Sequence, residues 1–277
     1  MKTRMFLLFT SMFFFALALP SCGGEAGHDH EGDDDEGMEE NHDDDAAAAA
    51  YTITPFDASA EFPDAAMESM DYKDGKFTYK VGGASYQLGA QTPDAPQKMC
   101  ANSGKGQHIH LIIDNNPYIA KYTAEFEQEV PGGEHYILSF LSRSYHESIK
   151  TPQAHLAKKV TVEGGAFTSS EDITVPMLFY SRPKGTYVGK AATGKVMLDF
   201  FLVNVDLSPD GYKVKANING KQEVILDKWQ PYYIEGLPMG DNKIELTLID
   251  KDGNTVDTPL NPAERVFTLK EDPAEAQ

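Results

Sequence analysis

The histidines beyond residue 50 are confined to one part of the chain. All five lie between positions 108 and 155, and none follows up to the C-terminus. Imidazole is the commonest protein ligand for transition metals. His108 and His110 are two residues apart, so on a β-strand both side chains leave the same face. The spacing predicts a pair of imidazoles that can share one metal ion; the alternative is two exposed polar residues on a strand.

A metal held by two histidines needs further donors, because zinc sites use three or four protein ligands. His135 begins the next predicted strand and His146 lies in the loop after it. Met99 and Cys100 precede the pair, and sulfur donors would favour copper; the alternative for Cys100 is a small buried hydrophobe. The predicted cofactor is copper or zinc, and the predicted metal ligands are His108, His110, His135 and His146.

A polar loop after the same predicted strand offers a second kind of site. Arg143, Tyr145 and Glu147 stand there among serines, with His146 between them. A guanidinium with neighbouring hydroxyl groups is suited to phosphate or carboxylate recognition. This loop therefore supports an alternative function, a surface module that recognises an anionic phosphopeptide or glycan, unless it is only the crest of a β-turn.

The pattern from residue 51 onward is that of an all-β protein. Short segments rich in Tyr, Phe, Val, Ile and Thr alternate with Gly, Pro, Asn and Asp. Asn219-Gly220 and Asp252-Gly253 are strong hairpin signals. One helical turn is expected at 65–70. The predicted strands are 76–81, 85–88, 108–113, 135–141, 159–162, 196–205, 212–218, 223–226, 232–235, 243–249 and 265–269.

An internal repeat organises these strands. Residues 130–162 align without a gap on 237–269, with seven identities in 33 positions, and Asp114-Asn115 falls on Asn219-Gly220. The matches lie at turns and at inward-facing strand positions, as expected for a duplicated β unit. We predict two tandem immunoglobulin-like β-sandwich domains, over 51–185 and 190–272. The five histidines have no histidine counterpart in the second copy, so the fold itself does not require them.

The N-terminal residues resemble an export signal. Lys2 and Arg4 precede an apolar run over 5–19, which is too short to span a bilayer as a helix. The segment ends in Leu19-Pro20-Ser21-Cys22, similar to the lipobox of bacterial lipoproteins. This resemblance implies a signal peptide over 1–21, lipidation of Cys22 and attachment to the outer membrane.

An acidic tether is expected over 22–50. Residues 25–45 contain twelve Asp or Glu, three His and no Lys or Arg, a composition that does not bury a core. Its histidines, His28, His30 and His42, predict loose metal gathering or, equally, a solvated spacer.

Charge and motifs exclude several functions. The net charge of −19 leaves about −9 after the signal and tether are set aside, so nucleic acid is not an expected partner. His146-Glu147 lacks the second histidine of a zincin helix, and Gly189 to Val196 lacks the Ser or Thr of a phosphate-binding loop. We therefore expect a binding protein and not an enzyme.

The first copy resembles a group of uncharacterised bacterial envelope lipoproteins. The similarity rests on Gly106-Gln107-His108-Ile109-His110, on Pro131-Gly132-Gly133-Glu134-His135 and on Tyr145-His146-Glu147-Ser148, and covers about 60 residues. It implies an extracytoplasmic sandwich with a histidine site; some members of the group carry a label of phosphopeptide binding.

Overall fold

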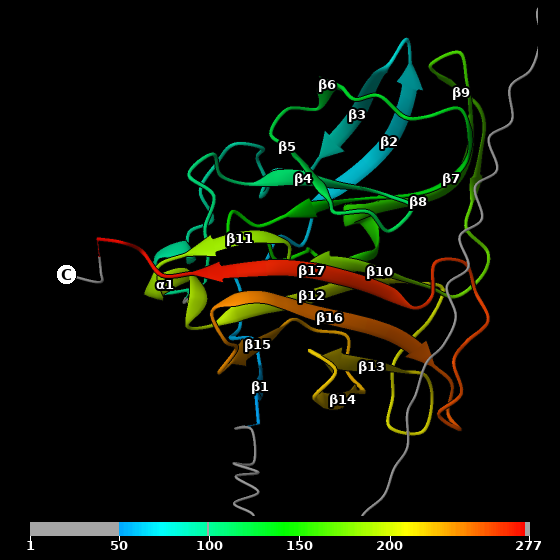
Figure 1. Ribbon diagram of the computed structural model, residues 1–277. Helices are drawn as coiled ribbons and strands as arrows, with labels where there is room; N and C mark the ends of the chain where they lie inside the picture. Colours follow the sequence, from blue (N-terminus) through cyan, green and yellow to red (C-terminus); the bar gives the residue numbers. More distant parts are fainter. Residues whose placement is uncertain (1–49, 99, 275–277) are drawn as a thin grey trace, which may run out of the picture. The chain divides into compact units, whose positions relative to one another are not determined.

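The structure is a computed structural model, and it describes residues 50–98 and 100–274. These residues form an all-β protein (Figure 1) with one short α-helix, α1 (Lys190–Thr193), and two 3-10 turns, η1 (Ala95–Gln97) and η2 (Pro152–Ala154). No helix in these ranges is long and apolar enough to cross a membrane. The predicted all-β fold is confirmed.

The strands form four sheets, which we number from the first to the fourth. The first sheet contains, in spatial order, β2 (Ala66–Lys73), β3 (Lys76–Gly82) and β6 (Glu125–Glu127). The second contains β5 (Ile119–Lys121), β4 (His108–Ile113), β7 (Gly133–Ser142), β8 (His155–Glu163) and β9 (Ala166–Asp172). The third contains β1 (Thr52–Pro55), β15 (Tyr232–Glu235), β12 (Val196–Val203) and β10 (Met177–Arg182). The fourth contains β11 (Gly185–Val188), β17 (Ala263–Lys270), β16 (Gly240–Ile249), β13 (Lys213–Ile218) and β14 (Gln222–Leu226).

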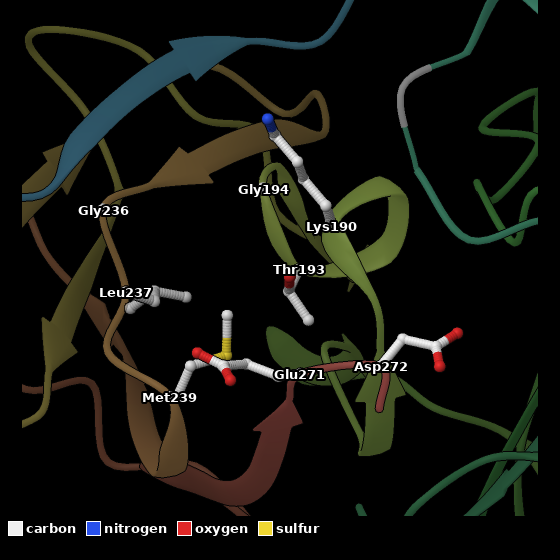
Figure 2. A pocket seen from close by; sticks show the side chains of 8 residues that line it. All are labelled: Lys190, Thr193, Gly194, Gly236, Leu237, Met239, Glu271 and Asp272. Carbon is white, nitrogen blue, oxygen red and sulfur yellow. The ribbon is translucent and has the colours of Figure 1, made fainter. Parts of the chain in front are cut away.

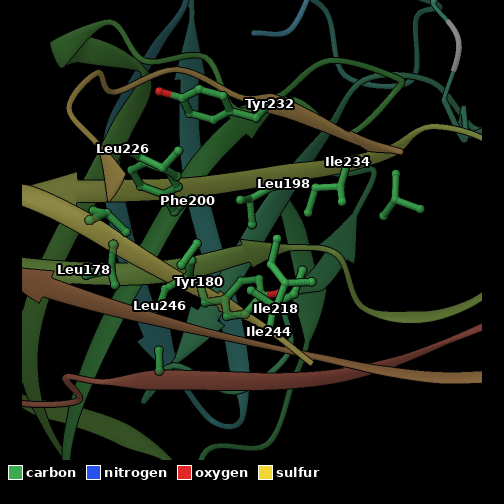
Figure 3. Close-up of a cluster of buried hydrophobic side chains, with 14 of the residues drawn as sticks. Leu178, Tyr180, Leu198, Phe200, Ile218, Leu226, Tyr232, Ile234, Ile244 and Leu246 are labelled. Carbon is green, nitrogen blue, oxygen red and sulfur yellow. The ribbon is translucent and has the colours of Figure 1, made fainter. Parts of the chain in front are cut away.

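Two hydrophobic cores make two tandem sandwiches. The first core lies between the first and second sheets and contains Phe77, Ile109 and Leu141. The second lies between the third and fourth sheets (Figure 3), where Leu178 and Phe200 pack with side chains of β13 and β16. Alternation along β4 places Ile109 and Leu111 in the first core, on the face opposite His108 and His110. The predicted pair of immunoglobulin-like sandwiches is confirmed.

A third core joins the two sandwiches. Phe140 of the second sheet stacks on Phe201 of the third, with ring centroids 5.2 Å apart, and Ile112, Leu138 and Phe179 complete the contact. The two middle sheets are therefore covered on both faces. This explains why every residue of β12 is buried, because a strand covered on both sides has no solvent-facing positions.

Polar contacts fix this junction between the sandwiches. Asp199, in the middle of β12, accepts hydrogen bonds from Ser148 N at 3.0 Å and from Lys150 Nζ at 2.5 Å. Asn115 accepts a hydrogen bond from Tyr180 N at 2.7 Å. Buried polar groups need such partners, so these bonds set the registration of one sandwich on the other.

The internal repeat extends to the strand register. Ile113 pairs with Ile137 in the first copy, and Ile218 pairs with Ile244 in the second. The turn residues Asp114 and Asn115 have positive φ, as do Asn219 and Gly220. The alignment made from the sequence therefore superimposes equivalent strands and turns.

Some local expectations differ from the structure. The helical turn expected at 65–70 is wrong, because Ala66–Lys73 is β2, and no strand forms over the predicted 85–88. The predicted strands also leave out β1, β5, β6, β9, β10 and β11. By sheet membership β1, β10 and β11 belong to the second sandwich, so the expected ranges 51–185 and 190–272 do not follow the sheets. Residues 1–49, with the expected signal peptide, Cys22 and most of the tether, lie outside the described residues.

Candidate metal centre

The two strand histidines face each other inside the protein. His108 and His110 lie on β4, and both are fully buried. Their Nε2 atoms are 2.9 Å apart. They lie on the face of the second sheet that the third sheet covers, so they are not the exposed polar residues of the alternative interpretation.

His146 joins this pair from the turn after β7. Its Nδ1 lies 3.1 Å from His108 Nε2. The backbone of His146 is left-handed, with φ of 72°, and the equivalent residue of the second copy is Gly253, with φ of 87°. A non-glycine residue in this conformation costs about 1 kcal/mol or more, and such strain clusters at functional sites.

The three imidazoles form a ready set of metal ligands. One nitrogen from each of His108, His110 and His146 lies within 4.8 Å of the other two. His108 Nδ1 is 2.8 Å from the carbonyl oxygen of Gly106, which only accepts, so Nδ1 carries the proton and Nε2 presents its lone pair. That single lone pair faces two other ring nitrogens. A metal ion at the centre would accept donation from all three.

Aromatic rings surround the histidine cluster. The ring of Tyr118 stacks on that of His110, with centroids 3.6 Å apart and an interplanar angle of 7°. Phe140 packs against His110 and Tyr122 against His108. Ser181 Oγ is 3.5 Å from His110 Nδ1, on the side of the ring opposite the cluster centre. These contacts restrict both rings, as supporting groups of metal ligands do.

The environment keeps the histidines neutral. Burial lowers the pKa of His108 to about 4, and it lowers the pKa of His110 and of His146 well below the usual value. The positive charges of Arg182 and Lys184 lower all three further. At neutral pH each imidazole therefore offers a lone pair without first losing a proton.

His135 has a structural place and is not brought into the cluster. Its Nδ1 is 2.6 Å from Asp114 Oδ2 and its Nε2 is 2.9 Å from Pro131 O. In the second copy Asn242 makes the equivalent contacts, to Asn219 and to the carbonyl of Pro238. Both ring nitrogens of His135 thus hold the hairpin, and the prediction of His135 as a ligand is not supported.

The loop side chains suggested for anion recognition are turned inward. Arg143 donates to Ala60 O from Nε at 2.9 Å and from Nη2 at 2.7 Å. Tyr145 is fully buried and its hydroxyl donates to Asp94. Glu147 accepts from Ser59 and lies 3.6 Å from Arg143. These groups bind segments of their own chain and do not present a surface to a peptide or glycan.

The remaining candidates lie outside the cluster. Cys100 is a free cysteine and is not among the clustered ligands; burial raises the pKa of its thiol to about 12. Met99 and the tether histidines lie outside the described residues. A separate pocket (Figure 2) has Leu237 and Met239 on one side and Lys190 and Thr193 of α1 on the other. It contains none of the clustered histidines.

Sequence reasoning missed the residues that surround the cluster. Tyr118 precedes β5. Ser181 and Arg182 end β10, a strand of the other sandwich, and Lys184 follows it. No spacing connects these residues with His108. The one available signal is Arg182 itself, a charged residue two positions after the apolar run 177–180.

Comparisons with known proteins identify no family for this chain. No family model matches it, and no curated protein matches it. The fibronectin(III)-like modules of Clostridium thermocellum CbhA are 12% identical, over 79% of this chain and 95% of that chain, with a TM-score of 0.27. A Bacteroides ovatus protein, SGBP-B of a mixed-linkage glucan utilization locus, is 11% identical over 80% of this chain and 70% of that chain, with a TM-score of 0.20. Likeness at this level carries no functional argument.

Proposed function

We propose that the protein binds a transition metal, copper or zinc, through His108, His110 and His146. The observation that carries this proposal is the clustering of three ring nitrogens, one from each histidine, within 4.8 Å of one another. Ligands at about 2.0–2.1 Å from a tetrahedral zinc ion lie roughly 3.3 Å from each other. Two of the three nitrogen pairs, at 2.9 and 3.1 Å, reach that spacing by movements of a few tenths of an ångström, and the third pair, His110 and His146, lies within 4.8 Å.

The burial of the site favours binding over catalysis. His108 and His110 are fully buried, and only His146 among the three is partly exposed. A metal ion can enter beside His146, whereas a substrate would need space that the aromatic walls fill. We therefore propose a metal-binding protein and not an enzyme, exported and held in the envelope by a lipid on Cys22. If so, replacing Cys22 with Ala should move the protein from the membrane fraction to the soluble fraction; an unchanged distribution would refute the anchor.

Calorimetric titration with Zn(II) and Cu(II) tests the metal site. The protein to use is the full chain with His28, His30 and His42 changed to Ser, so that the tether contributes no imidazole. We expect one ion per chain, with binding lost or weakened at least about a hundredfold in His108→Gln and in His146→Gln. The absence of stoichiometric uptake would end the proposal.

His135→Asn is the matched control. It removes an imidazole from the same sandwich but installs the residue that performs the equivalent role in the second copy, Asn242. Metal affinity should stay within about twofold of the parent. A loss equal to that of His146→Gln would show that the cluster has been wrongly assigned.

A further inference from the structure

Arg182 is directed toward the histidine side of β10 by an irregularity in the strand. Tyr180 pairs with Phe200, but Arg182, two residues on, pairs with Asp199, and the register shifts between them. Residues directly opposite each other in an antiparallel pair share a face. The carboxylate of Asp199 bonds to Ser148 and Lys150 of the first sandwich, so Arg182 also faces the first sandwich. Such bulges commonly re-aim a side chain next to a functional site.

The guanidinium of Arg182 is only partly satisfied: it hydrogen-bonds to Tyr118 and is attracted by Asp199, but it forms no close ion pair among the described residues. Arg182 is 5% exposed, and its Nε and Nη1 atoms are buried without a hydrogen-bond partner. No carboxylate of the described residues lies within ion-pair distance of it, and Asp199, opposite it, is paired with Lys150 at 2.5 Å. An arginine keeps its charge even when buried, and an unpaired buried charge costs several kcal/mol.

A second cation lies against the same wall of the cluster. Lys184 Nζ donates to Tyr118 O at 2.8 Å and lies 3.9 Å from the centroid of the Tyr118 ring. The same ring stacks on His110, and its hydroxyl lies 3.3 Å from His146 Nδ1. Burial lowers the pKa of Lys184 to about 8, so it remains largely charged at neutral pH. Unlike Arg182, Lys184 is partly exposed.

The positive charges of Arg182 and Lys184 would repel a metal cation at the histidine cluster, and three neutral imidazoles do not offset that repulsion. A small anion resolves this conflict, because it can ligate the metal and accept hydrogen bonds from the free guanidinium N–H groups. We propose that the metal is bound together with a small oxyanion of the carboxylate or carbonate type, held by Arg182 and Lys184. This inference rests on the proposed function, and it assigns the ligand position that the three histidines leave open.

Cobalt(II) spectroscopy tests the anion site. Co(II) takes the geometry of zinc and its visible absorption reports a change of ligand. The full chain carrying the serine substitutions in the tether is first titrated with Co(II) and Zn(II) in a buffer free of small anions, and then with sodium formate, bicarbonate or chloride. We expect formate or bicarbonate to change the spectrum and to tighten metal binding by about tenfold.

Variants separate the anion site from the metal site. Arg182→Met and Lys184→Met should bind Co(II), while the response to formate and bicarbonate should weaken about tenfold or disappear; Lys184→Met, at a partly exposed position, covers the case in which Arg182→Met does not fold. Lys215→Met, which removes one positive charge from β13, should respond like the parent. The anion site would be overturned, and the metal site kept, by any of three results. Metal binding could be insensitive to oxyanions, it could respond only to chloride, or the variants could respond as strongly as the parent. Failure to bind Co(II) and Zn(II) at all would overturn both.

Discussion

The same strand has opposite surroundings in the two copies. In the first copy β4 turns His108 and His110 toward the third sheet, and both are fully buried. In the second copy the equivalent residues of β13, Lys213 and Lys215, are partly exposed on the outer face of the fourth sheet. The pairing of β4 with β7 and that of β13 with β16 have the same backbone register. A face that is a solvated surface in one copy has become an internal junction in the other, and a metal site can be built there because water is excluded.

The largest effect is expected from exchanging residues between these strands. His110→Lys places an ammonium group in a buried site close to Arg182 and Lys184, and should lower the free energy of unfolding by about 3–5 kcal/mol. The reverse exchange, Lys215→His, lies on the outer face and should change it by less than about 0.5 kcal/mol. Denaturant unfolding of both variants measures the difference. Equal effects would mean that the two faces are not as different as their burial indicates.

Acid should destabilise the metal-free protein through the first copy. The pKa of His108 is about 4 when folded, below the usual 6.5, so the unfolded chain binds the proton more tightly. The contribution of neutral His108 to the free energy of unfolding is fully present above pH 6.5 and is lost as the pH falls toward 4. The loss amounts to about 3 kcal/mol for this group. Denaturant unfolding in the presence of a chelator, between pH 7 and 4, gives the slope of the free energy of unfolding against pH. The same series in His108→Gln should be flatter, and an identical slope would contradict the assignment.

A smaller effect is expected at the turn that presents His146. His146→Gly installs the residue of the second copy at a left-handed position, whereas His146→Ala removes the ring and keeps the strain. The glycine variant should be about 1 kcal/mol more stable than the alanine variant, and both should lose metal binding. Thermal unfolding compares them. If the alanine variant is the more stable one, the left-handed backbone at position 146 does not destabilise a non-glycine residue.

A good part of this site could be predicted from local sequence. The spacing of His108 and His110 determined that they share a strand face, because side chains alternate along any strand. The internal repeat showed which histidines the fold does not need. It was less informative for His135, because an asparagine and a histidine make the same hairpin contacts at that position.

The sequence by itself determined the all-β class, the duplicated register and the pairing of two imidazoles, since these follow from periodicity and turn chemistry within short segments. Only the tertiary structure decided that His146 completes the cluster, that Arg143 and Tyr145 point inward, and that Arg182 arrives from the other sandwich. The physical reason is that packing of one sheet on another depends on the complementarity of whole faces. No spacing along the chain encodes which residues of two distant faces will meet.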